Sequence, residues 1–227
     1  MEGNHLIYSK AAGKVMARYL KKQYTPQEGD RLQKAADRQY QQFLKELPDL
    51  GGKKNYQAQS VYDCIALFAL YEVLPQKMSL EAFEELVNQI FVPGYKPVAW
   101  VNMNWKPVQR IAARIFAHLA KVGKAHEAQW PGNYHMYALP YDPKEGVHFG
   151  FTSCPIADFA RAHGYTHLMP AMCNPDYPTL AVIKAGLIRT RTCAEDECCD
   201  YWILGDQAPQ MQEHPLYRDG KGFLRNK

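Results

Sequence analysis

Five of the six cysteines in this 227-residue chain lie in its C-terminal third, among aspartates and arginines. They are Cys154, Cys173, Cys193, Cys198 and Cys199. Cysteine serves proteins as a nucleophile, a metal ligand or a redox partner. The chemistry of the chain should therefore be sought first in this segment.

The position of Cys154 favours a reactive thiol. It follows an apolar segment, 147–151, predicted to be a strand, and it precedes Pro155, the expected first residue of a helix. Backbone N–H groups and the positive end of the helix dipole would favour a thiolate there. The alternative is a small apolar side chain buried where a strand meets a helix.

Cys173 and Asp176 form a second candidate group. They bracket Asn174 and Pro175, which favour a turn before a helix that continues from Tyr177. Asp176 could cap this helix and still offer a carboxylate oxygen to a site, although capping alone would also explain an aspartate there. Asn174 is a further candidate for substrate binding.

Two arginines are expected to supply positive charge. Arg189 and Arg191 are two residues apart in a predicted strand, 187–193, so their side chains would share one face of a sheet. Two guanidinium groups on one face repel each other unless an anion or carboxylates lie between them, which suggests that they bind a substrate carboxylate. A solvated sheet face is the alternative.

Other residues of the segment are assigned supporting roles. His148 lies in the strand before Cys154 and is a candidate for substrate binding, while Cys199 and Asp200 would support the site from the last hairpin. Adjacent Cys198 and Cys199 would point to opposite faces of that strand. The cysteine spacings match no standard zinc site, so we expect neither a metal nor a cofactor.

Two regions of different secondary structure must position these residues. Apolar spacing and capping residues predict about five helices in a helical region, 1–127, including a capping box at 25–28 and a largely apolar helix over 56–74. The region 128–227 has the order strand, strand, helix, helix, strand, strand. This pattern predicts an α+β fold with a mostly antiparallel sheet, in one continuous globular unit.

Composition and charge restrict the classes of partner. Lysine and arginine, 27 in all, exceed the 23 acidic residues by four, without blocks of like charge. This balance argues against nucleic acid and fits an anionic small-molecule substrate.

No segment approaches the roughly 18 apolar residues of a membrane span, and Met1 to His5 lack the basic start of a leader. We expect a cytoplasmic protein without a membrane partner. The helix over 56–74 could lie in the core or form a homo-oligomer contact.

The ordered motifs of residues 130–206 resemble the family of L-2-amino-thiazoline-4-carboxylic acid hydrolases. The matching motifs are Ser153-Cys154-Pro155, Cys173-Asn174-Pro175-Asp176, Arg189-Thr190-Arg191-Thr192 and Cys199-Asp200-Tyr201. The family often carries a glycine-containing turn before its last strand, whereas the turn at 193–198 is acidic here. This departure puts the substrate in doubt more than the fold.

The resemblance implies that the chain opens a cyclic amidine, as in the conversion of 2-amino-thiazoline-4-carboxylate to N-carbamoyl-cysteine. Cys154 or Cys173 would attack the ring carbon C2 or shape the pocket. Asp176 would activate water or pair with the substrate amidinium, and Arg189 and Arg191 would hold the carboxylate. Two other classes stay open: a small-molecule-binding or sensor module related to vinyl-reductase-type domains, and a cysteine-based metal or redox protein.

Overall fold

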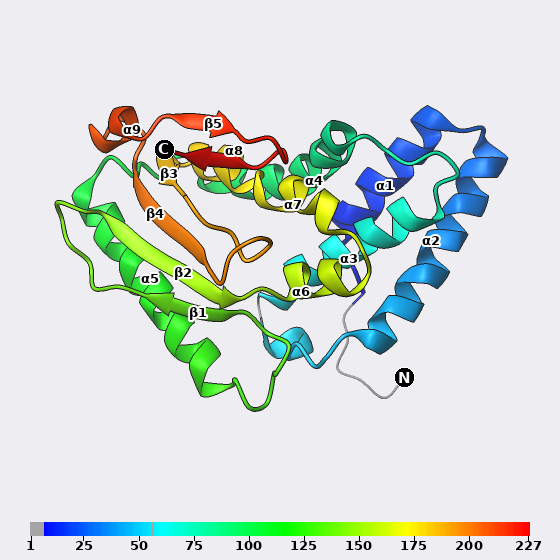
Figure 1. The fold of residues 1–227 in the computed structure, drawn as a ribbon, viewed down its shortest axis with the longest axis horizontal. Coiled ribbons are helices and arrows are strands. Elements are labelled where there is room, and N and C mark those ends of the chain that lie inside the picture. The colour runs from blue at the N-terminus through cyan, green and yellow to red at the C-terminus, as the bar shows by residue number, and fades with distance from the viewer. Residues whose placement is uncertain (1–6, 56) are drawn as a thin grey trace.

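A computed structural model describes residues 7–55 and 57–227 and confirms the predicted α+β fold (Figure 1). Tyr56, at the start of one predicted helix, and Met1 to His5 lie outside these residues. The first half of the chain contains the helices α1 (Lys10–Gln23), α2 (Pro26–Glu46), α3 (Ala58–Val73), α4 (Leu80–Tyr95) and α5 (Lys106–Ala125). Short 3-10 turns lie at Gly52–Lys54, Lys96–Val98 and Thr166–Leu168.

Local signals of the sequence set the ends of the N-terminal helices. Thr25 and Glu28 form the predicted capping box at the start of α2, with Pro26 as its first residue. Ser79 caps α4 in the same way, by accepting the backbone N–H of Ala82. These polar groups satisfy donors that the first turn of a helix leaves unpaired.

Helix α3 forms the centre of the helical half. Every residue from Val61 to Tyr71 is buried, because the helix is apolar on almost all of its faces and neighbouring helices cover it. Within the described part of the chain, none of the helices combines the length and the apolar character that a bilayer crossing requires.

The C-terminal half is built on a four-stranded antiparallel sheet of order β1-β2-β4-β3. A small second sheet pairs β5 with β6. The strands are β1 (His135–Ala138), β2 (Val147–Ser153), β3 (Ala185–Ile188), β4 (Cys199–Gly205), β5 (Leu216–Arg218) and β6 (Leu224–Asn226), and the helices are α6 (Pro155–Ala162), α7 (Met169–Cys173), α8 (Asp176–Ala181) and α9 (Gln210–Glu213). Three short helices, rather than the two predicted, therefore separate β2 from β3.

The strand predicted over 187–193 is wrong beyond Ile188, where β3 ends. The carboxylate of Asp200 accepts the backbone N–H groups of Thr190 and Arg191 at 3.1 and 2.6 Å. Asp196 likewise accepts the N–H of Thr192 at 2.9 Å. Side-chain carboxylates thus take the donors that a continued strand would present to its neighbour, and the chain leaves the sheet as a loop.

Two apolar clusters hold the halves together. Helix α5 covers one face of the sheet, with the ring of Phe116 stacked on Phe149 at a centroid distance of 4.1 Å. The other cluster joins α2 and α3 to α6, where Phe159 contacts Phe43 and Phe68. In Figure 1, the sheet and α5 lie on the left, and α1 and α2 lie on the right. Helix α6 lies between these two groups.

Candidate active site

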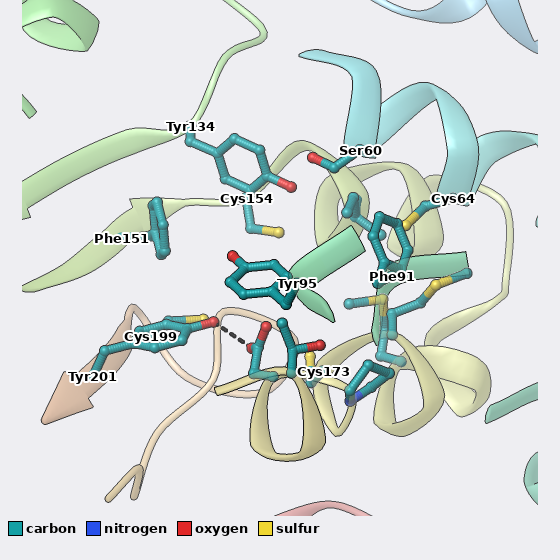
Figure 2. Close-up of a pocket in the computed structure, with 16 residues that line it drawn as sticks. Ser60, Cys64, Phe91, Tyr95, Tyr134, Phe151, Cys154, Cys173, Cys199 and Tyr201 are labelled. Atoms are coloured by element: carbon teal, nitrogen blue, oxygen red, sulfur yellow. Dashed lines mark hydrogen bonds between the residues drawn. The ribbon is translucent and has the colours of Figure 1, made fainter. Parts of the chain in front are cut away.

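A cavity of about 250 Å³ lies between α3, α4, the short helices α6 to α8 and the sheet. Of the predicted site residues, Cys154, Cys173, Asp176 and Cys199 contribute to its wall. Cys64, which sequence reasoning did not assign to the site, adds a fourth thiol from α3. The four thiols come from separate elements and surround one space (Figure 2).

Asp176 is held by two donors at the base of this cavity. Its Oδ2 atom accepts hydrogen bonds from Nη1 of Arg189 and from the hydroxyl of Tyr201, both at 2.7 Å (Figure 2, dashed line for Tyr201). Its Oδ1 atom has no hydrogen-bond partner among residues 7–55 and 57–227, and the side chain is 38% exposed. One carboxylate oxygen is therefore fixed, and the other is open to a ligand. Asp176 begins α8, and Pro175 occupies the cap position that was predicted for it.

Arg189 lies behind Asp176 and not in the cavity wall. Its side chain is fully buried, and Nη2 donates to the backbone carbonyl of Cys173 at 3.0 Å. The guanidinium also lies over the rings of Tyr177 and Tyr201, 5.0 and 5.6 Å from their centroids. Arg189 thus pairs with Asp176 from behind and fixes its orientation.

Burial opposes the thiolate form that the sequence favours for Cys154, and it acts in the same direction on Cys173. Cys154 directly precedes α6 and Pro155 begins the helix, as predicted. Burial nevertheless raises the pKa of Cys154 far above its usual value, although the N–H groups of Ala157 and Ile156 oppose the shift. Burial also raises the pKa of Cys173 to about 12, against the opposing charge of Arg189. Desolvation therefore outweighs the helix terminus here.

Cys199 makes a contact within the protein. Its Sγ accepts the backbone N–H of Cys193 at 3.0 Å. The pKa of the Cys199 thiol is raised, mainly by the hydrogen bond with the side chain of Cys193 and secondly by burial. Cys199 therefore lines the cavity as a neutral group.

Sequence reasoning missed the tyrosines of the cavity. Tyr95, Tyr134 and Tyr201 come from the end of α4, the segment before β1, and β4, and Figure 2 shows their rings around the same space. Burial raises the pKa of Tyr134 and Tyr201 well above the usual range, so both hydroxyls stay protonated. Tyr201 could have been found, because it lies two residues after Cys199 on a strand and so faces the same side.

Besides Arg189, four predicted residues lie away from the cavity wall. Asn174 is 1% exposed, and it donates to Glu84 and to the backbone carbonyl of Gly222. His148 stacks on Trp202 at 5.2 Å, on the sheet face opposite Tyr201. Asp200 binds the backbone of the 189–198 loop.

Arg191 is exposed in that loop. The expectation that Arg189 and Arg191 share a sheet face is therefore wrong, because the chain leaves the sheet after Ile188. The structure thus contains no arginine pair facing the cavity from β3. In the residues that the structure describes, no group of three or more His, Cys, Asp or Glu side chains is arranged to hold a metal ion.

Comparison with known proteins agrees with the motifs of the sequence. A family model described as L-2-amino-thiazoline-4-carboxylic acid hydrolase matches residues 57–203, which is more than half of the chain. This range includes the whole described wall of the cavity, from Ser60 to Tyr201. No curated protein and no solved structure matches the chain. By the extent of the family match, the chain belongs to the L-2-amino-thiazoline-4-carboxylic acid hydrolase family.

Proposed function

We propose that this chain is a hydrolase that opens a small cyclic amidine by adding water to the ring carbon between the two heteroatoms. The observation that carries the proposal is Asp176, with one carboxylate oxygen fixed by Arg189 and Tyr201 and the other open in the cavity. The family match supports hydrolysis, since its description names a hydrolase of L-2-amino-thiazoline-4-carboxylic acid.

Asp176 fits the role of anchor for the amidinium. A protonated cyclic amidine carries its positive charge over the ring carbon C2 and the attached nitrogens, and a carboxylate oxygen is their natural partner. Pairing with Asp176 would favour the protonated form, which makes C2 more electrophilic. The low polarity of the surrounding wall strengthens this attraction.

Asp176 can also take a proton from the attacking water. Water would add to C2, the C2–S bond of a thiazoline would break, and the sulfur would leave with a proton. For a 2-amino-thiazoline, the oxygen of water becomes the carbonyl oxygen of a carbamoyl group. The two hydrogens of water end on the sulfur and on the ring nitrogen, so one water is consumed.

The thiols allow a second route, in which Cys154 or Cys173 attacks C2 and water later releases the product. Neutral thiols are weak nucleophiles, and burial keeps both of these protonated. The raised pKa values therefore favour direct attack by water, with the thiols shaping the pocket.

The test is hydrolysis by three variants, Asp176→Asn, Cys154→Ala and Cys173→Ala. Cyclic amidines, including 2-amino-thiazoline-4-carboxylate, would be screened for a mass gain of one water. We expect Asp176→Asn to lower kcat/KM by about 10²- to 10⁴-fold, as for the loss of a general base. The cysteine variants should keep turnover if water attacks directly, whereas loss of turnover in one of them would assign the thiol route.

Folding must be followed in the same samples, because Asp176→Asn leaves the guanidinium of Arg189 without the carboxylate that balances its charge. We expect Asp176→Asn to lower the free energy of unfolding by about 3 kcal/mol. This value is near the lower limit for breaking a buried ion pair, because Asp176 is 38% exposed. Tyr201→Phe removes only a hydroxyl and should lower kcat/KM about fivefold. Asp30→Asn, an exposed aspartate of α2, is the matched control. A folded Asp176→Asn variant with unchanged hydrolysis would overturn the proposal.

A further inference from the structure

The cavity continues into a second lobe between α5 and the sheet. This apolar lobe measures about 300 Å³, and it adjoins the thiol lobe, the 250 Å³ space around the four cysteines. Asp176 and Tyr201 line both lobes, together with Ser60, Tyr95 and Tyr134. The open carboxylate therefore stands at the junction of the two lobes.

The apolar lobe has the chemistry of a site for a hydrophobic group. Apart from Gln57, the described residues that line this lobe alone are Phe116, Leu119, Met136, Phe149, Leu180 and Ile203. The rings of Phe116, Phe149 and Tyr201 are stacked in series, with centroid distances of 4.1 and 4.7 Å, so this wall is already formed. A thiazoline ring with only small substituents would occupy the thiol lobe and leave the apolar lobe unfilled.

The described walls of the two lobes offer no cationic partner for a substrate carboxylate. Within the described part of the chain, the wall of neither lobe includes a lysine, arginine or histidine. Arg189 is near, but it is fully buried behind Asp176, with both terminal nitrogens bound to protein oxygens. A carboxylate buried without a cation is strongly disfavoured, and here it would also meet the negative charge of Asp176.

We propose that the substrate of this chain is a cyclic amidine that carries an uncharged apolar group, preferably aromatic, instead of a carboxylate. The amidinium pairs with Oδ1 of Asp176 at the junction, the ring lies toward the thiol lobe, and the apolar group fills the other lobe. This inference rests on the proposed function and departs from the anionic substrate expected from the sequence.

The test compares 2-amino-thiazolines that differ only at ring position 4, which carries hydrogen, carboxylate or phenyl. Calorimetry gives the binding constants of the three compounds, and mass spectrometry gives their turnover. We expect the phenyl compound to bind about 10- to 100-fold more tightly than the unsubstituted ring, as for burial of one aromatic group. The carboxylate should bind more weakly than the unsubstituted ring.

A pair of substitutions in α5 locates the apolar group. Leu119→Trp replaces a leucine side chain with a bulky indole ring in the apolar lobe and should remove most of the preference for phenyl over hydrogen. Ile115→Trp, one turn earlier on the same helix, changes a side chain that is 51% exposed and lies outside both lobes. This control should keep the preference unchanged.

The two proposals fail in different ways. If the compounds bind in the expected order but none gains water, the proposed hydrolysis is wrong and the assignment of the ligand class stands. If the 4-carboxylate compound binds or turns over at least as well as the 4-phenyl compound, the inferred substrate class is wrong and the proposed hydrolysis is unaffected. An unchanged phenyl preference in Leu119→Trp would also overturn the inference.

Discussion

Arg189 lies behind Asp176 and does not line the cavity, although it was predicted to bind substrate. A fully buried guanidinium is tolerated because Asp176 balances its charge and the carbonyl of Cys173 accepts a second hydrogen bond. The backbone N–H of the same arginine donates to Asn226 at 3.0 Å. These contacts make Arg189 a positioning residue for the carboxylate.

Arg189→Lys should therefore destabilise the fold. Lysine keeps the charge but cannot hold Asp176 and the carbonyl of Cys173 with one planar fork. We expect the free energy of unfolding to fall by about 1–3 kcal/mol, the cost of unsatisfied buried groups, in urea denaturation. Arg191→Lys, in the exposed part of the same loop, should stay within about 0.5 kcal/mol of the parent chain. Equal effects of both substitutions would contradict the positioning role.

Cys173 should make the fold sensitive to alkaline pH. Burial raises the pKa of its thiol from 9.0 to about 12. Between these values the unfolded chain has lost a proton that the folded chain keeps, so the free energy of unfolding decreases as pH rises. Below pH 9 both states hold the proton and this contribution is constant.

Urea denaturation of the parent chain and of Cys173→Ala at pH 8, 9, 10 and 11 checks this dependence. The parent chain should lose up to about 1.4 kcal/mol per pH unit more than the variant above pH 9. The comparison cancels the titration of the tyrosines and the other cysteines, provided that the variant keeps the fold. Parallel curves for the two chains would show that the thiol of Cys173 titrates normally.

The sequence identified those site residues that lie beside a local signal. Cys154 precedes a helix that begins with proline, and Cys173 and Asp176 flank a turn, so each could be found from its neighbours. Ser60 and Tyr134 reach the cavity from distant segments, and nothing in their local sequence indicates where they lie in the fold. Burial of Cys154 was one of two interpretations that its sequence left open, and the choice between them depends on how α3 and the sheet pack.

At the scale of elements, local signals predicted helices better than the strand after Gly186. Caps and apolar spacing located α2 and α4 because both signals lie within each helix. The end of β3 depends on Asp200, ten residues further along the chain than Thr190, whose N–H it accepts. The hydrogen bonds from this loop to Asp200 leave no periodic pattern in the sequence of residues 187–193, so that sequence alone does not show where the strand ends.

Gly150, in the middle of β2, should be intolerant of a side chain. A Cβ atom there would lie 2.3 Å from the carbonyl oxygen of Cys199 and 2.4 Å from the hydroxyl of Tyr137. Gly150→Ala must therefore displace β4, which also carries Tyr201. We expect a loss of about 1–3 kcal/mol in stability, as for overpacking, together with reduced turnover of the amidine substrate.

Gly94, in the last turn of α4, provides the matched control for this substitution. A Cβ atom at Gly94 would meet nothing within 4 Å. Gly94→Ala should keep the stability or raise it by up to about 1 kcal/mol, because alanine is favoured over glycine in helices. Thermal unfolding and urea denaturation of the two variants give the comparison, and equal stability for both would show that β2 and β4 separate easily.

At the scale of the whole molecule, the C-terminal segment closes the structure behind the site. The backbone N–H of Leu224 donates to Asn174 at 2.8 Å, and the hydroxyl of Tyr177 donates to the carbonyl of Leu224 at 3.1 Å. Arg225 forms ion pairs with Glu195, Asp196 and Asp219. Asn174, which we expected to bind substrate, thus joins this segment to α7.

This segment, residues 216–226, should control the rigidity of Asp176. Phe223 is 2% exposed and belongs to the main apolar cluster, so it anchors the segment. Phe223→Ala should lower the free energy of unfolding by about 3–5 kcal/mol. Leu216→Ala, in the same segment but 48% exposed, should have a much smaller effect.

Hydrogen exchange distinguishes a local role of this segment from a general loss of stability. In Phe223→Ala, amides of residues 173–189 should exchange faster than those of α3, because their partners at Leu224 and Asn226 loosen first. Turnover of the amidine should fall in parallel, since Arg189 and Asp176 lose their fixed geometry. An equal increase in exchange over α3 and residues 173–189 would mean that Phe223 stabilises the molecule as a whole, and that the site does not depend on the C-terminal segment in particular.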